Sequence, residues 1–411
     1  MDYCLKLARG EPARPNRPIE TDLLALAQRG RARADALYLG ATGSGEGGAG
    51  PSAGEVSYQT YHPPLFHGLG AVVIKAGSAA GLTLTGCILA LRIICVLMAL
   101  AGRVLVFMTL AHFGRLPALI GLPYLAFLAP VDLFRVSNDS LVTLLGAWVF
   151  WLLATGDASR RREPRALLIG LLLLMTVNVK LTAALFLLPA VGIVILALRR
   201  TDGTSLRELA FVLLPGCVMF IALVASSWTD ASNPAGIGHL RSGAFPEPGG
   251  WSLGLLVPSV ERWVNWYNLY LANETLVGAG RGSALFPLHH LITLSQVGVM
   301  LGLGWLVFVR PDAADGPLMR LRRWTGGALI ALLAIQTIFV VLWAVVGRVN
   351  WSFRQFALVE MVAILPAAAG WAWLAARPWP MGKVFRPAMW AGAALLFSRS
   401  TWPYFQLMRG G

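Results

Sequence analysis

The sequence predicts an all-α, polytopic integral membrane protein, a helical bundle of about 10–12 transmembrane helices whose external loops lie on the membrane. Three observations support this fold class. Of 411 residues, 56% are hydrophobic and only 13% are charged, with a mean hydropathy of +0.65. The apolar residues form repeated runs about as long as a bilayer is thick. The arginines gather in short segments between these runs, a pattern typical of membrane topology rather than of nucleic-acid binding.

Each apolar run is expected to form one helix. The expected spans lie at about 65–80, 83–108, 116–134, 139–155, 165–180, 183–198, 208–227, 288–309, 326–346, 356–376 and 387–402. The runs 165–180 and 183–198 could instead form one bent helix, but Lys180 and Pro189 favour a break between them.

The positive charges predict which ends of the spans share a side of the membrane. They fall in four loops: Arg160, Arg161, Arg162 and Arg165; Arg199, Arg200 and Arg207; Arg310, Arg320, Arg322 and Arg323; Arg377, Lys383 and Arg386. With two crossings between successive loops, all four share one side, which the positive-inside rule makes cytoplasmic. Residues 1–64, the junction Asp132–Asp139 and the end of the Lys180 span then lie on the opposite face.

The chain accordingly divides into four parts. Residues 1–64 are an external polar segment with amphipathic stretches, 65–227 an N-terminal transmembrane bundle, 228–287 an external aromatic-rich loop and 288–411 the C-terminal transmembrane helices. An external N-terminal segment needs a preceding span, so we expect a first transmembrane helix encoded upstream of Met1. The alternative is an internal N-terminus with one span miscounted.

Lys180 is the most informative residue, because it lies inside the apolar stretch LLLLMTVNVKLTAALFLLP (171–189). A charge within a bilayer costs roughly 2.5–3.5 kcal/mol on insertion scales, and such residues usually face a partner or a polar cavity. A second polar group, Ser137-Asn138-Asp139, opens the preceding span. Together these residues predict a polar site near one bilayer face that handles an anionic substrate.

The order of four motifs resembles the GT-C membrane glycosyltransferases that use polyprenyl-phosphate sugars, a branch that includes the protein O-mannosyltransferases and the lipid A aminoarabinose transferase. The segments are His62-Pro63-Pro64-Leu65-Phe66, Leu91-Arg92, Ser137-Asn138-Asp139-Ser140-Leu141 and VNVKLTAALFLLP (177–189). They resemble the family's H/Q-P-P-L-aromatic helix start, its A-L-R-L-L segment, its N-D-x-L helix start and its L-T-K-x-T-A-L-x-x-x-P signature. The resemblance covers about residues 1–376.

The resemblance implies a hexosyl- or pentosyl-type glycosyltransferase in the cell envelope, in a bacterial inner or plasma membrane. It implies transfer with inversion from a polyprenyl-phosphate sugar to an unidentified acceptor at the non-cytoplasmic face. Membrane lipid is the other expected partner, and no nucleic acid is expected. No cofactor is firmly implied; a divalent metal is compatible with the chemistry, but nothing in the sequence requires one.

The sequence departs from the family where the resemblance places the catalytic acid. That acid follows the family's first membrane helix, usually as Asp with an acidic neighbour, and no Asp-Asp, Asp-Glu or D-x-D occurs here. We expect it upstream of Met1, with Asp2, Asp35 and Glu55 as weaker candidates for the base. Two alternatives therefore stay open: a non-enzymatic carrier or flippase of lipid-linked sugars, and an inactive paralogue.

Each candidate binding residue has a functional and a structural interpretation. Lys180 would hold the departing lipid phosphate, or would extend to the headgroups without a ligand. Asn138 and Asp139 would act near the donor, or would cap a helix. The remaining candidates are Arg354 and Arg348, which would bind phosphate or anchor a helix, and His62, which would bond the donor or brace its loop.

Overall fold

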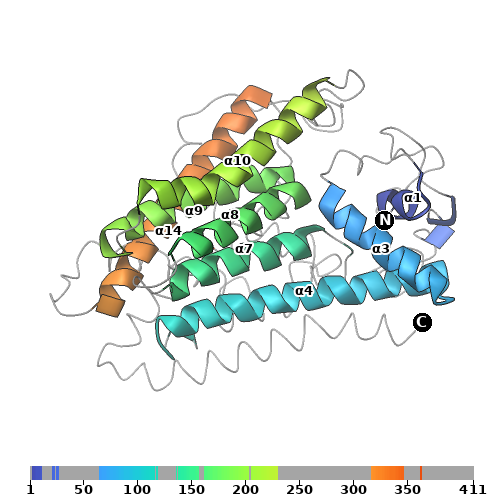
Figure 1. The fold of residues 1–411 in the computed structure, drawn as a ribbon, viewed down its shortest axis with the longest axis horizontal. Helices are drawn as coiled ribbons and strands as arrows, with labels where there is room; N and C mark the ends of the chain where they lie inside the picture. The colour runs from blue at the N-terminus through green and yellow to red at the C-terminus, as the bar shows by residue number, and fades with distance from the viewer. Residues whose placement is uncertain are drawn as a thin grey trace, which may run out of the picture.

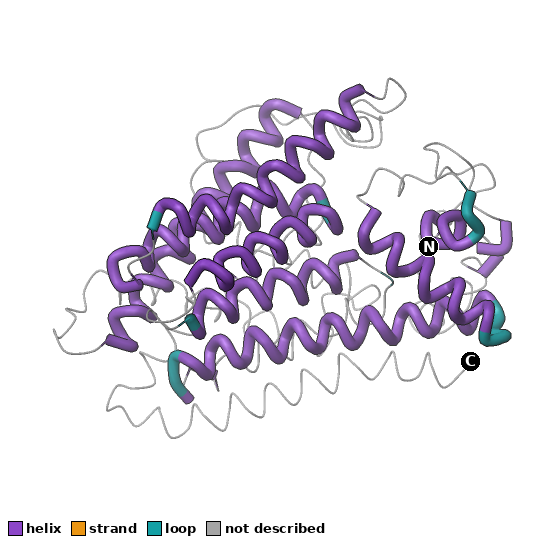
Figure 2. Tube along the Cα trace, viewed as in Figure 1, coloured by secondary structure: helices purple, strands orange, loops and turns teal. Residues whose placement is uncertain are grey.

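The described part of the protein is helical, in agreement with the predicted fold class (Figure 2). The computed structural model describes residues 2–11, 21–23, 25–26, 64–115, 117–118, 136, 138–156, 162–202, 205–229, 316–346 and 362. Of these residues 92% are helical and none is in a strand. The helices are α1 (Asp2–Ala8), α3 (Pro64–Ala79), α4 (Leu84–His112), α7 (Asn138–Thr155), α8 (Arg162–Val179), α9 (Leu181–Asp202), α10 (Leu206–Thr229) and α14 (Gly316–Val346). The predicted spans 288–309 and 387–402 lie outside the described residues, and of the spans 116–134 and 356–376 only residues 117–118 and 362 are described.

Three of the four predicted arginine loops meet at one end of the bundle. Arg165 and Arg320 both donate to the carbonyl oxygen of Leu153, near the end of α7, at 3.2 and 2.9 Å. Arg207 pairs with Glu163 in the first turn of α8. We call this the arginine end, and the opposite end, where α7 begins and α8 stops, the Lys180 end. The fourth predicted loop, 377–386, lies outside the described residues.

The helix predicted at 65–80 is present as α3, and its position bears on the predicted topology. Helix α4 runs toward the arginine end. This direction is shown by Phe113, the residue after α4, whose ring lies 5.5 Å from that of Trp324 in α14, measured between centroids. Helix α3 lies at the other end of the bundle, beside α1, and a turn at Gly81 joins it to α4 (Figure 1). Counting 65–80 as a crossing would put residues 1–64 on the arginine side. The predicted topology therefore holds only if α3 does not cross.

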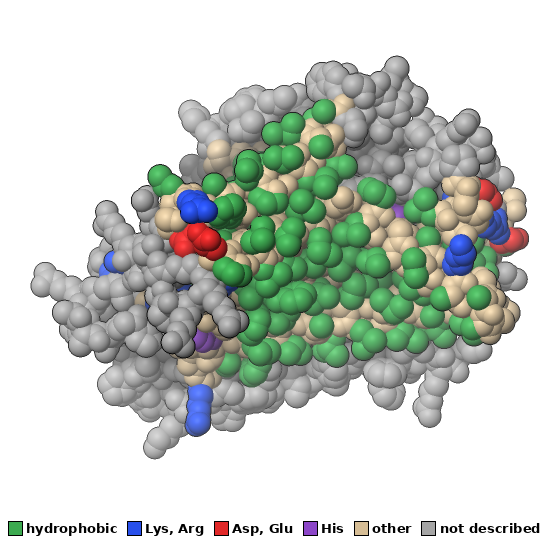
Figure 3. All heavy atoms as spheres, viewed as in Figure 1, with side chains coloured by type: hydrophobic (Ala, Val, Ile, Leu, Met, Phe, Trp, Pro, Cys, Tyr) green, Lys and Arg blue, Asp and Glu red, His purple; other side chains and the backbone are tan. Residues whose placement is uncertain are grey.

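The surface of the bundle carries apolar side chains, which is the reverse of a water-soluble protein. Along α4 an outward stripe at helical spacing is about half exposed: Leu89, Ile93, Leu97, Leu100, Val104 and Met108. Hydrophobic side chains cover the middle of the face in Figure 3, and charged ones lie toward its two ends. Within the described helices, α4, α7 and residues 206–225 of α10 are long and apolar enough to cross a membrane. These features indicate a helical membrane protein.

Three glycines allow the most extensive helix contacts, those of α4 with α7, α8 with α10 and α9 with α14. A Cβ at Gly102 would lie 3.1 Å from the Cα of Leu144, and one at Gly170 would clash with the carbonyl oxygen of Phe211. A Cβ at Gly327 would lie 2.8 Å from that of Ala197. Small residues let helices in lipid approach closely enough to gain van der Waals contact. This packing sets the spacing of the helices that hold the site.

Candidate functional site

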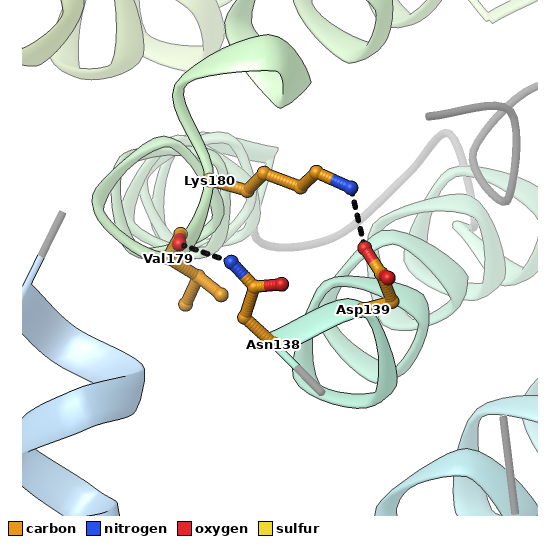
Figure 4. Close-up of polar contacts among 4 residues, drawn as sticks. All are labelled: Asn138, Asp139, Val179 and Lys180. Carbon is orange, nitrogen blue, oxygen red and sulfur yellow. Dashed lines mark hydrogen bonds and ion pairs between the residues drawn. The ribbon is translucent and has the colours of Figure 1, made fainter. Parts of the chain in front are cut away.

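Lys180 forms a buried ion pair with Asp139 at the Lys180 end. Its Nζ lies 2.5 Å from Oδ1 of Asp139, and the two side chains are only 11% and 5% exposed. Figure 4 shows the lysine side chain extended from the α8–α9 junction to the first turn of α7. Because the ammonium ends on a carboxylate inside the bundle, the interpretation that Lys180 extends to the headgroups is wrong. Whether the pair also holds a donor phosphate stays a prediction.

A break in the helix directs the lysine. Helix α8 ends at Val179 and α9 begins at Leu181, so Lys180 is the one non-helical residue between them. Its amide still donates to the carbonyl of Thr176 at 3.0 Å, and its own carbonyl accepts from Ala183 at 2.9 Å. The break predicted at Lys180 is confirmed, whereas Pro189 lies within α9 without ending it. A residue between two helices can direct its side chain across the bundle.

Asn138 fixes the same junction from the other side. Its Nδ2 donates to the carbonyl of Val179 at 3.3 Å (Figure 4). That carbonyl is one of the last four of α8, which have no partner within their own helix. The amide therefore satisfies the end of α8 and ties it to the start of α7. Neither Asn138 nor Asp139 is explained by capping α7 alone, because the observed side-chain bonds reach across to 179 and 180.

Electrostatics make this pair a demanding arrangement. Removing two charges from water is costly, and in a buried pair the attraction offsets that cost only when the geometry is close. Removing one partner typically costs about 3–5 kcal/mol, because the remaining charge stays buried. The pair therefore places an ammonium and a carboxylate in direct contact inside an apolar bundle. An anion entering here would meet a preformed ammonium and the carboxylate beside it.

Further polar atoms next to the pair in sequence have no hydrogen-bond partner. Ser140 is fully buried, and its Oγ makes no hydrogen bond; the same holds for Oδ1 of Asn178, whose Nδ2 contacts Sδ of Met219 at 3.6 Å. Ser140 follows Asp139, and Asn178 precedes Lys180 by two positions. Buried polar groups in native proteins are usually satisfied by protein, water or ligand. The chain around the pair thus retains hydrogen-bonding capacity for another molecule.

Within the described part of the chain, no other predicted site residue lies at this pair. Asp2 lies in α1, which packs on α3. Asp35, Glu55, His62, Arg348 and Arg354 lie outside the described residues, and their assignments stay predictions. In the described helices and turns, no group of three or more His, Cys, Asp or Glu comes together as a metal site.

Sequence reasoning missed two buried polar features. Arg103, in the second half of α4, is only 8% exposed although it lies inside a predicted span. Cys4 of α1 is fully buried with its Sγ 3.6 Å from Nδ1 of His67 in α3. A charge within an apolar run is a signal the sequence does carry, so Arg103 could have been found. The Cys4–His67 contact joins positions 63 residues apart and has no local signal.

Comparison with known proteins adds no relative. The chain matches no family model, no curated protein and no solved structure. The geometry of the Lys180 end, together with the sequence motifs, is therefore the basis for the function proposed next.

Proposed function

We propose that this chain is a membrane glycosyltransferase that moves a sugar from a polyprenyl phosphate to an acceptor at the membrane face of the Lys180 end. The observation that carries the proposal is the buried Lys180–Asp139 pair. Its two residues come from two of the four segments that resemble the GT-C motifs, the N-D-x-L start and the K-x-T-A-L signature. That segments 41 residues apart meet in one contact supports treating them as parts of one site.

The chemistry needs a cation where the lipid phosphate departs. Negative charge grows on that phosphate as the glycosidic bond breaks, and a preorganised ammonium in a water-poor site stabilises it strongly. Lys180 would supply this charge, and Asp139 would hold the ammonium in its direction before the donor binds. On binding, the phosphate would share the ammonium with the carboxylate. Asn138 would hold the α8–α9 junction so that the lysine keeps this direction.

The reaction also needs a base for the acceptor hydroxyl. Asp139 is committed to Lys180, so it is not our choice for that role. The candidates within this chain are Asp2, Asp35 and Glu55. Of these, Asp2 lies in α1, which packs beside α3 (Figure 1).

Donor binding and donor turnover test the proposal separately. The protein, purified in nanodiscs, is given a polyprenyl-phosphate hexose or aminopentose with a labelled sugar, and both bound donor and released polyprenyl phosphate are measured. We expect Lys180→Met to lose turnover by roughly a hundredfold, the scale of removing one electrostatic contact to the transition state. Lys75→Met, which removes an exposed lysine of α3, is the matched control.

Each outcome decides between the alternatives. If the wild type turns the donor over and folded Lys180→Met protein does so at the same rate, the phosphate role of Lys180 is refuted. Donor that binds and changes leaflet with its glycosidic bond intact would identify a carrier instead. Protein that binds donor through Lys180 but neither cleaves nor moves it would identify an inactive paralogue.

A further inference from the structure

The arginine end holds two cations on one backbone oxygen. The Nη2 atoms of Arg165, from the first turn of α8, and of Arg320, from the first turns of α14, both donate to Leu153, so their guanidinium groups lie side by side. Leu153 is one of the last residues of α7, and its carbonyl has no helical partner. Such a carbonyl oxygen has two lone pairs and accepts both bonds, but it carries no full negative charge. A second full charge beside the first is unfavourable unless negative charge lies nearby.

Two more donors follow within one turn of α14. Arg323 and Trp324 lie three and four positions after Arg320, which puts them near the same face of the helix. Nη1 of Arg323 and Nε1 of Trp324 are buried and have no hydrogen-bond partner. Trp324 is fully buried, held between the rings of Phe113 and Phe150. Guanidinium and indole nitrogens act only as hydrogen-bond donors. The partner that Arg323 and Trp324 lack is therefore a hydrogen-bond acceptor.

The described carboxylates at this end are engaged elsewhere. Glu163 lies 3.4 Å from Arg207, and both side chains are largely exposed. Glu208 accepts from the amide of Ser205 at 2.7 Å and closes a capping box at the start of α10. Neither carboxylate accepts from Arg323 or Trp324. The missing acceptor is therefore best supplied by a bound anion.

We propose that the arginine end binds a phosphate-bearing anion through Arg323 and Trp324, beside the guanidinium groups of Arg165 and Arg320. Guanidinium groups match phosphate oxygens in charge and geometry. The phosphate is either the headgroup of an anionic phospholipid, for which juxtamembrane arginines are suited, or a soluble phosphate from the adjoining aqueous phase. This site lies at the opposite end of the bundle from Lys180 and does not depend on the proposed glycosyl transfer.

Native mass spectrometry of the purified full chain tests the proposal by titration with phosphatidylglycerol and, separately, with phosphatidylcholine. We expect tighter binding of phosphatidylglycerol, weakened about tenfold by Arg323→Gln, the scale of losing a hydrogen bond to a charged group. Trp324→Phe removes the indole N–H but keeps a ring, so it gives a second probe if Arg323→Gln fails to fold. Arg207→Gln, an exposed arginine at the same end, should change the affinity by less than about twofold.

A parallel arm separates the two sources of phosphate. Inorganic phosphate is added at millimolar concentration to the protein in phosphatidylcholine nanodiscs, and the thermal unfolding of the protein is followed. Stabilisation that Arg323→Gln removes would assign a soluble phosphate, whereas lipid selectivity without this effect would assign the headgroup. Equal binding of the two lipids with no effect of phosphate would overturn the proposal. Equal losses in Arg323→Gln and Arg207→Gln would also overturn it, because they would show a diffuse field and no site.

Discussion

The Lys180–Asp139 pair predicts a strong energetic coupling between two helices. In the single variant Asp139→Asn, the carboxylate is lost while the lysine charge stays in a site where its side chain is 11% exposed. Breaking a buried pair in this way costs about 3–5 kcal/mol, and Lys180→Met should cost a similar amount by leaving the carboxylate. The double variant removes both charges. It should cost far less than the two single variants together, because no uncompensated charge remains.

The assay is a double-mutant cycle on the free energy of unfolding, followed by far-UV circular dichroism as denaturing detergent is added in mixed micelles. We expect the coupling energy of the pair to exceed about 2 kcal/mol. The control cycle uses Glu163→Gln and Arg207→Gln, whose side chains are 61% and 72% exposed at 3.4 Å. That surface pair should couple by less than about 1 kcal/mol. If the two cycles gave equal, small couplings, the buried ion pair would not exist as described.

Three further predictions concern packing, hydrogen bonding and accessibility. Gly170→Ala should destabilise the bundle by about 1–3 kcal/mol in the same unfolding assay, because its Cβ would meet the backbone of α10, while Gly68→Ala, with nothing within 4 Å, should not destabilise it. Asn138→Ala should cost about 1 kcal/mol through the lost bond to Val179, and a variant as stable as the wild type would count against that bond. A water-soluble maleimide should leave the fully buried Cys4 unmodified in folded protein and modify it after denaturation, as read by peptide mass spectrometry; rapid labelling of native protein would contradict the α1–α3 packing.

Some features of the fold could be predicted because they depend on local sequence. The helix break at Lys180 was expected because a charge interrupts an apolar run. The three arginine loops were expected at one end of the bundle because the positive-inside rule depends only on the charges of the loops themselves. The helix at 65–80 was also expected and is present as α3, but hydropathy measures how apolar a segment is and not which way it runs, so whether α3 crosses the membrane stays a prediction. Part of the apolar surface of α3 packs on α1 and α4.

The partner of Lys180 could not be predicted in the same way. Both Lys180 and Asp139 were selected as site residues, but their contact depends on how α7 packs on α8, 41 residues later in the chain. The same reason applies to Leu153, a backbone acceptor whose side chain gives no hint of the two arginines that reach it. Long-range contacts of this kind are set by helix packing, which periodicity alone does not encode.

The ion pair also has a consequence for membrane insertion. Of the three described helices able to cross a membrane, α7 is the least apolar, and Asp139 lies in its first turn. Its neighbour α8 carries charged residues in its first turn and is followed at once by Lys180. If α7 entered lipid alone it would expose the carboxylate of Asp139, and if α8 entered alone it would expose the ammonium of Lys180 just beyond its end. If the two entered as a hairpin, these opposite charges could neutralise each other. We therefore expect α7 and α8 to enter the membrane together as one unit. A substitution that removes the charge of either Asp139 or Lys180 should then impair the insertion of both helices.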